Sequence, residues 1–136
     1  MRKIIILILL LIVNDLISAN DVYEYIRPLV SELMPDKITK AHMALGYIAD
    51  FQATIDDTNF KVYFPQAPDF TEFNINSKDL KSIIPLMKKV SDIMKCQMLN
   101  LGEEIELNKN NCIIKISFTR NELWDYYEIA VKCYKK

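Results

Sequence analysis

The stretch CIIKISFTRNELWDYYEIAVKCYKK, residues 112–136, contains two different hydrophobic patterns, and their interpretation determines the fold class. Apolar residues alternate through 112–118, which predicts a half-buried strand. Thr119 and Glu122 then have the spacing of a capping box. A narrow polar stripe follows at helical spacing, made of Asn121, Asp125, Glu128, Lys132 and Lys135. We therefore expect a strand followed by a closing helix.

The segment before this strand predicts another helix, from about residue 82 to 101. Its apolar face consists of Ile83, Met87, Val90, Met94, Met98 and Leu101. Ser82 is the expected cap, which places Pro85 in the first turn, where its missing N–H removes no hydrogen bond. Gly102 is a natural stop. Polar and apolar residues alternate over 104–107, which predicts a strand, and the turn NKNN (108–111) follows. We therefore expect this strand to form a hairpin with the strand over 112–118.

The first half of the chain predicts two helices and a second hairpin. DVYEYIRPLVSELMP (21–35) predicts a helix capped by Asp21, kinked at Pro28 and ended by Pro35. A broad apolar arc predicts a helix over 36–54. Turn-forming residues follow at 56–59. Polar and apolar residues then alternate over 60–64 and again over 71–75, with PQAP (65–68) between them, which predicts two paired strands.

The expected element order is therefore α-α-β-β-α-β-β-α, an α+β fold. Because the strands come in adjacent hairpins with one apolar face, we expect a small antiparallel or mixed four-stranded sheet with helices packed on one face. No repeat or change of composition marks a second domain, so residues 20–136 are expected to form one domain.

Residues 1–19 are interpreted as a signal peptide. Arg2 and Lys3 precede an apolar run from Ile4 to Val13, and Ser18-Ala19 supplies small residues for cleavage after Ala19. Ten helical residues rise about 15 Å, half of a bilayer core of about 30 Å. A retained membrane anchor and a buried core helix are the alternatives. Cleavage predicts a periplasmic or secreted protein in an oxidising compartment.

Three cysteines in an exported chain suggest one disulfide and one remaining thiol. The strand from Cys112 travels about 20 Å. A helix folding back over it returns about the same distance, which brings Cys133 level with Cys112. We therefore expect a Cys112–Cys133 disulfide with Cys96 as the free thiol. Three buried reduced cysteines are the alternative.

Few motifs of catalysis or cofactor binding are present. His42 is the only histidine and is expected on a helix surface, and two glycines cannot build a phosphate-binding loop. A methionine stripe (Met87, Met94, Met98) could bind Cu(I), but core packing explains it better. We predict no cofactor, no metal site and no catalytic residues, although dispersed carboxylates remain an alternative. With 17 Lys+Arg against 18 Asp+Glu, no nucleic-acid partner is expected.

The aromatic residues of the expected last helix suggest an interaction surface. Two-thirds of its circumference is apolar, more than packing on one sheet requires. The second apolar stripe consists of Trp124, Tyr127, Val131 and Tyr134. If no neighbouring helix covers it, this stripe would contact another protein, because Trp and Tyr are enriched in such contacts.

A basic face formed by Lys81, Lys88, Lys89 and Lys95 is interpreted as solvated, with an acidic partner or lipid headgroups as the alternative.

The sequence thus favours a small exported, non-catalytic binding or accessory protein that acts through a protein-interaction surface or a ligand pocket. The partner is expected to be another protein, and a membrane contact is expected only through an uncleaved N-terminal segment. Two alternatives remain: a membrane-anchored subunit of an envelope complex that retains residues 4–19, and an enzyme with dispersed carboxylate residues.

Overall fold

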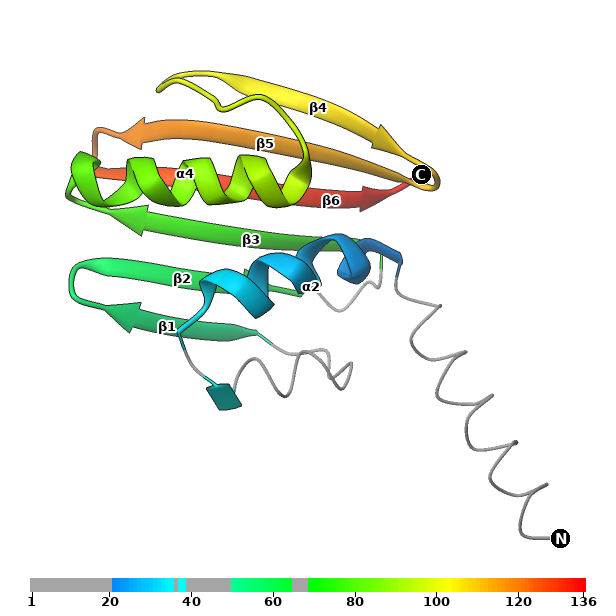
Figure 1. The fold of residues 1–136 in the computed structure, drawn as a ribbon, viewed down its shortest axis with the longest axis horizontal. Coiled ribbons are helices and arrows are strands. Elements are labelled where there is room, and N and C mark those ends of the chain that lie inside the picture. The colour runs from blue at the N-terminus through cyan, green and yellow to red at the C-terminus, as the bar shows by residue number, and fades with distance from the viewer. Residues whose placement is uncertain (1–20, 36, 39–49, 65–68) are drawn as a thin grey trace, which may run out of the picture.

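The computed structural model describes residues 21–35, 37–38, 50–64 and 69–136. In these ranges the chain forms two helices and six strands (Figure 1). The helices are α2 (Asp21–Leu33) and α4 (Leu80–Met94). The strands are β1 (Phe51–Ile55), β2 (Thr58–Tyr63), β3 (Phe70–Ser77), β4 (Glu104–Lys109), β5 (Cys112–Asn121) and β6 (Tyr126–Lys135). The expected signal peptide, residues 1–19, and most of the helix expected over 36–54 lie outside the described residues.

All six strands belong to one antiparallel sheet in the order β1-β2-β3-β6-β5-β4. The expected architecture, a four-stranded sheet of two hairpins with helices packed on one face, is therefore wrong. Both expected hairpins exist, as β2–β3 and β4–β5. The two additional strands are β1 at one edge of the sheet and β6 at its centre.

The segment expected to be the closing helix is strand β6. Ile129, Val131 and Cys133 are buried and alternate with side chains on the other face, which is strand periodicity. β-Branched and aromatic residues favour strands. β6 also hydrogen-bonds to a neighbour on each side, β3 and β5. Thr119 lies in β5, so it caps no helix.

β1 replaces the end of the helix expected over 36–54. Phe51 pairs with Val62 and Ile55 pairs with Thr58, so a two-residue turn, Asp56-Asp57, joins β1 to β2. Asp56 has φ +52°, a conformation that aspartate tolerates better than most residues. The turn expected over 56–59 is therefore shorter than its sequence suggests, and strand pairing begins at Thr58.

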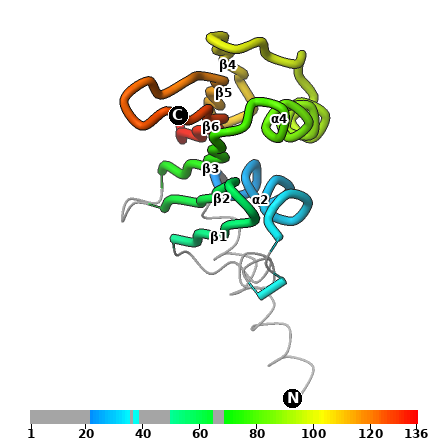
Figure 2. Tube along the Cα trace, turned by 90° about the vertical axis from the view of Figure 1, so that its left-hand side faces the viewer, coloured from blue at the N-terminus to red at the C-terminus, as the bar shows by residue number. Residues whose placement is uncertain are grey.

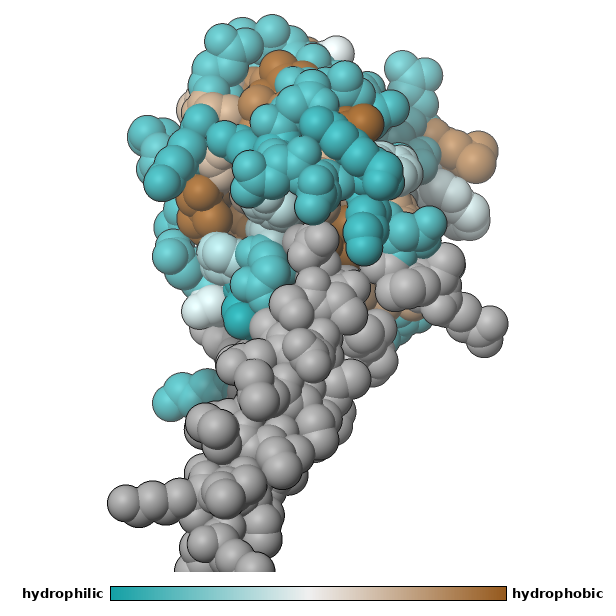
Figure 3. Space-filling view, turned by 90° about the vertical axis from the view of Figure 1, so that its right-hand side faces the viewer, coloured by the Kyte–Doolittle hydropathy of each residue, from teal (hydrophilic) through white to brown (hydrophobic). Residues whose placement is uncertain are grey.

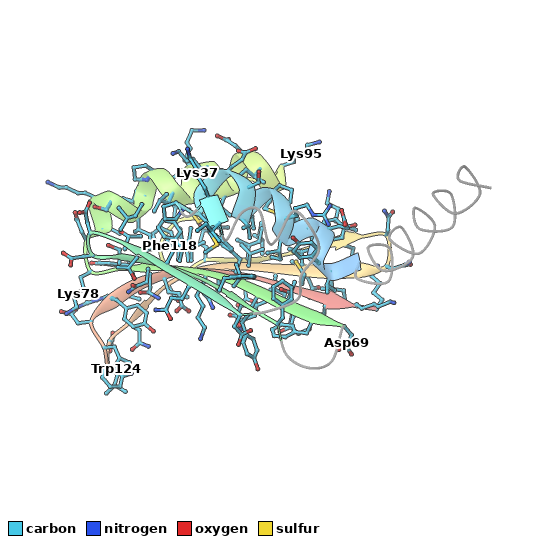
Figure 4. The ribbon with its side chains drawn as sticks, turned by 90° about the horizontal axis from the view of Figure 1, so that it is seen from below. Lys37, Asp69, Lys78, Lys95, Phe118 and Trp124 are labelled. Atoms are coloured by element: carbon cyan, nitrogen blue, oxygen red, sulfur yellow. The ribbon has the colours of Figure 1, made fainter. Side chains whose placement is uncertain are left out.

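Both helices lie against the same face of the sheet, and the opposite face carries neither of them (Figures 2 and 4). The core lies between these layers, and β3 and β6 supply its centre. Its largest fully buried side chains are Phe73, Ile26, Leu29, Met34, Ile75, Ile83, Met87, Leu99, Ile114, Ile116 and Ile129. Figure 4 shows Phe118 directed toward the helices.

α4 begins and ends earlier than its sequence suggests. Its cap is Asp79, whose Oδ1 accepts a hydrogen bond from the N–H of Lys81 at 3.0 Å. Pro85 is therefore inside the helix, where it removes one backbone hydrogen bond. Lys95, with φ +56°, ends the helix, and Met98 and Leu101 follow in the loop with substantial exposure.

The fold predicts that alanine substitutions at two neighbouring residues of β3 change the unfolding free energy by very different amounts. Phe73 is fully buried beneath the helices, whereas Glu72 points to the other face. Phe73→Ala should cost about 3–5 kcal/mol of unfolding free energy because it leaves a cavity. Glu72→Ala should change this free energy by at most about 1 kcal/mol, since it opens no core cavity and removes only a long, partly exposed ion pair with Lys132. Urea denaturation of both variants measures the difference. Similar costs for both would contradict the assigned face of β3.

Candidate functional site

Two of the three most exposed large apolar side chains among the described residues lie at the tip of the β5–β6 hairpin, and the third is Ile38. Residues 122–125 form this turn, and Leu123 and Trp124 retain 83% and 68% of their accessible surface. The backbone of the tip is fixed by short contacts. The N–H of Trp124 donates to Asn121 Oδ1 at 3.1 Å, and Arg120 Nη2 forms an ion pair with Asp125 Oδ1 at 2.8 Å. The chain thus presents two large apolar side chains on an ordered turn.

The structure separates the four residues that the sequence grouped as one interaction surface. Trp124 projects from the tip, on the side of the sheet away from the helices (Figure 4). Val131 is fully buried beneath the helices, and Tyr127 packs partly against the same core. Tyr134 lies on the opposite face, against the ring of Phe70 with centroids 4.9 Å apart. They form no common stripe, because alternate residues of a strand face opposite ways.

A polar ladder crosses the face of the sheet that α2 and α4 leave uncovered. Thr54 Oγ1 donates to Asn59 Oδ1 at 2.6 Å, and Asn59 Nδ2 donates to Asn76 Oδ1 at 3.1 Å. Asn76 is paired in register with Glu128. In the next row, the buried Oδ1 of Asn74 has no hydrogen-bond partner among the described residues. This part of the face carries half-buried hydrogen-bonding groups, and sequence periodicity alone indicated only that it would be polar.

Two carboxylates interact electrostatically on this uncovered face. Partial burial raises the pKa of Glu128, and the negative charge of Glu72 raises it further. Lys132 lowers the pKa of Glu128 and lies 4.0 Å from Glu72. A carboxyl group with a raised pKa is a feature of general acids, but structural charge clusters produce the same shift. Neither carboxylate lines any of the three pockets described in this section and below.

Two pockets lie on either side of the β1–β2 turn, at the end of the sheet where the hairpin tip also lies (Figure 1). They share Asp56, Asp57 and Ser77 and have volumes of about 400 and 460 Å³. The first extends toward α4 and includes Phe60 and Leu86. The second lies on the uncovered face and includes Thr54, Asn59, Asn76, Lys78 and Tyr126. Both offer oxygen acceptors, and Lys78 is their one lining cation.

The three cysteines are present as thiols. Cys112 and Cys133 are buried on the same face of adjacent strands, but Cys133 is opposite Ile114, so the pair is diagonal. Diagonal partners have Cα atoms about 7–8 Å apart. The usual range for a disulfide ends at about 6.8 Å. Closing the expected bond would therefore draw β5 and β6 together locally, and the disulfide remains a prediction.

The remaining residues considered for catalysis or metal binding, His42 and three methionines, form no such site in the described part of the chain. His42 lies outside it. Met87 and Met94 are buried in α4, whereas Met98 lies beyond the helix, so the three sulfurs share no helical stripe. Within the described ranges, no group of three histidine, cysteine or carboxylate side chains could hold a metal. In the same ranges, no helix has the length and apolar character needed to cross a bilayer.

The pKa of Glu128 leads to a prediction about pH and stability. Because its pKa is higher in the folded chain than in the unfolded chain, folding favours its neutral form. Its unfavourable contribution is absent below the unfolded pKa and develops as the pH rises through the folded value. Glu128→Gln should therefore raise the melting temperature at pH 7, and this gain should disappear toward pH 4. Thermal unfolding across this range is the measurement, and a gain that grows on acidification would contradict it.

Thiol labelling tests the cysteine assignments. In the folded chain, iodoacetamide should label Cys96 first, because Cys112 and Cys133 are buried. Burial raises the pKa of Cys96 and Cys133, so labelling should accelerate with pH. In denaturant without reductant, the expected disulfide predicts that only Cys96 of the exported protein reacts. Labelling of all three, measured by mass spectrometry, would exclude the disulfide.

Comparison with known proteins assigns no family to this chain. No family model matches the sequence, and neither a curated protein nor a solved structure is similar enough to match.

Proposed function

We propose that this chain is a small exported, non-catalytic binding protein that contacts another protein through the tip of its β5–β6 hairpin. The supporting observation is the exposure of Leu123 and Trp124 on a turn whose backbone is held by Asn121 and by the Arg120–Asp125 ion pair. A soluble chain gains nothing in isolation from exposing two adjacent large apolar side chains on an ordered turn.

The energetics of burial support a role for this tip in binding. Burial of one large apolar side chain contributes about 1.5–3 kcal/mol. Tryptophan is also enriched among the residues that dominate protein interfaces. The turn is ordered before binding, so little conformational entropy is lost when a partner covers it. The polar uncovered face of the sheet lies beside the tip and can supply hydrogen bonds around an apolar contact.

Export rests on the N-terminal sequence, which lies outside the described residues. The alternatives remain a membrane-anchored subunit and an enzyme. The interacting carboxylates Glu72 and Glu128 are the observation that most favours an enzyme. They are half-buried but line none of the three described pockets, whereas most catalytic groups occupy a concave pocket, so we favour binding over catalysis.

Trp124 provides its own test, because it is the only tryptophan in the chain. Its fluorescence reports directly on the tip. The free protein should emit as an exposed indole that acrylamide quenches readily. Adding the exported fraction should shift the emission to shorter wavelength, and immobilised protein should capture a partner. Trp124→Ala should weaken capture at least tenfold, since a dominant interface residue contributes about 2 kcal/mol or more.

Ile84→Ala is the matched control, because Ile84 is another exposed apolar residue but lies on the outer side of α4. It should capture the partner normally. Both variants should keep the wild-type melting temperature. Equal capture by all three proteins would contradict the proposal, as would a fluorescence shift produced by lipid vesicles alone.

A further inference from the structure

The partner of the hairpin tip can be characterised by the chemistry that the tip requires. Leu123 and Trp124 need an apolar recess. Glu122 and Asp125 add two negative charges beside them, and Arg120 compensates one of these charges. A complementary site would therefore be an apolar recess with a cationic border.

The chain itself contains a recess of this kind. It has a volume of about 240 Å³ and lies between the start of α2, the end of α4 and the end of β4. Tyr25, Pro28, Ile93 and Met94 form its apolar lining, and Glu24, Lys95 and Lys109 are its charged residues. Pockets for small molecules usually occupy about 300–1,000 Å³. This recess is smaller and suits a single large side chain.

The charges of the recess complement those of the tip. Glu24 is paired with Arg27, whose Nη2 lies 3.1 Å from Glu24 Oε1. Lys95 and Lys109 are exposed and form no ion pair with any described residue. The recess therefore has a net positive border, whereas the tip carries a net negative charge.

Pro28 adds a hydrogen-bond acceptor near the recess. A proline has no N–H, so the helical hydrogen bond that residue 28 would donate to the carbonyl of Glu24 is missing. Both residues line the recess. The indole N–H of a tryptophan is a donor without acceptor capacity. The Glu24 carbonyl, which lacks its usual helical donor, therefore belongs to a residue that lines the recess.

Tip and recess cannot meet within one molecule. The tip lies where β5 ends and β6 begins, while the recess lies at the opposite end of the sheet, where α4 ends (Figure 1). Lys95 and Trp124 also lie on opposite sides of the sheet (Figure 4). Figure 3 shows the end of the molecule that includes the recess elements as a mostly hydrophilic surface interrupted by small hydrophobic patches. Contact therefore requires two copies.

We propose that the tip of one copy inserts Trp124 into the recess between α2 and α4 of a second copy, with Lys95 and Lys109 facing Glu122 and Asp125. This inference rests on the proposed role of the tip in protein binding and identifies the partner as this chain. The contact joins unlike surfaces, so a pair of copies retains one free recess and one free tip, and growth produces an open chain or a closed ring. The small interface makes the association weak and transient.

Two complementary variants test the contact. Trp124→Ala has a defective tip and an intact recess, whereas the double variant Lys95→Glu, Lys109→Glu has an intact tip and a repulsive recess. In sedimentation velocity, the mass of the wild type should increase with concentration. Each variant alone should remain monomeric, with association weakened at least tenfold. Their mixture should form a one-to-one pair and no larger species.

Fluorescence follows insertion directly, because Trp124→Ala contains no tryptophan. Titrating this variant into the double variant should shift the emission of Trp124 to shorter wavelength. The shift should weaken when salt rises from about 0.1 M to about 1 M, which shortens the Debye length from about 10 Å to about 3 Å. Ile84→Ala is the control and should associate as the wild type does.

The outcomes separate this inference from the proposed function. A monomeric wild type at all concentrations, or a mixture without pairs or a fluorescence shift, would overturn self-association. If the wild type still captured a different protein and Trp124→Ala did not, the binding role of the tip would stand while its partner was another chain. Unchanged association of Trp124→Ala with itself would overturn the inference as well.

Discussion

The antiparallel pairing of β3 with β6 is the constraint on which the rest of the structure depends. It joins two three-stranded units, β1-β2-β3 and β4-β5-β6, into one sheet. Phe73 lies opposite Val131 and Ile75 opposite Ile129, so the pairing also assembles the centre of the core. Without it, each unit would expose the apolar face of a small sheet, and the helices would have no continuous surface to cover.

The two units resemble each other in the way their helices are built. Ile26-Arg27-Pro28-Leu29 in α2 corresponds to Ile83-Ile84-Pro85-Leu86 in α4. In both helices the isoleucine is buried and the proline lies on the exposed side. A proline on that side removes a hydrogen bond on the convex, solvent-facing surface and lets the helix bend over the sheet. The same Ile-x-Pro-Leu sequence thus occurs in both helices, and each proline removes one backbone hydrogen bond.

The sequence predicted both hairpins, whose outer faces are clearly polar, and it failed for the central strand β6 and for the edge strand β1. In β2 and β5, polar and apolar residues alternate, which indicates a strand directly. β6 is central, so its second face carries the buried Ala130 and half-buried residues such as Tyr134. Its few polar residues then also fit a helical stripe, and short segments satisfy both periods. This error grouped Trp124 with the core residue Val131. Exposure of the tip depends on the turn at 122–125, which a helix would not contain.

The position of β6 also affects the order in which the protein can acquire its structure during synthesis. The central strand is translated after all the others, so the first five strands emerge without the partner that unites them. Closing the β3–β6 pair brings together residues that are 50 to 64 positions apart, and such distant contacts form slowly. A nascent chain with this topology cannot complete its sheet until its final strand has been made. For the proposed export, this delay keeps the polypeptide in a state that can be threaded through a membrane pore.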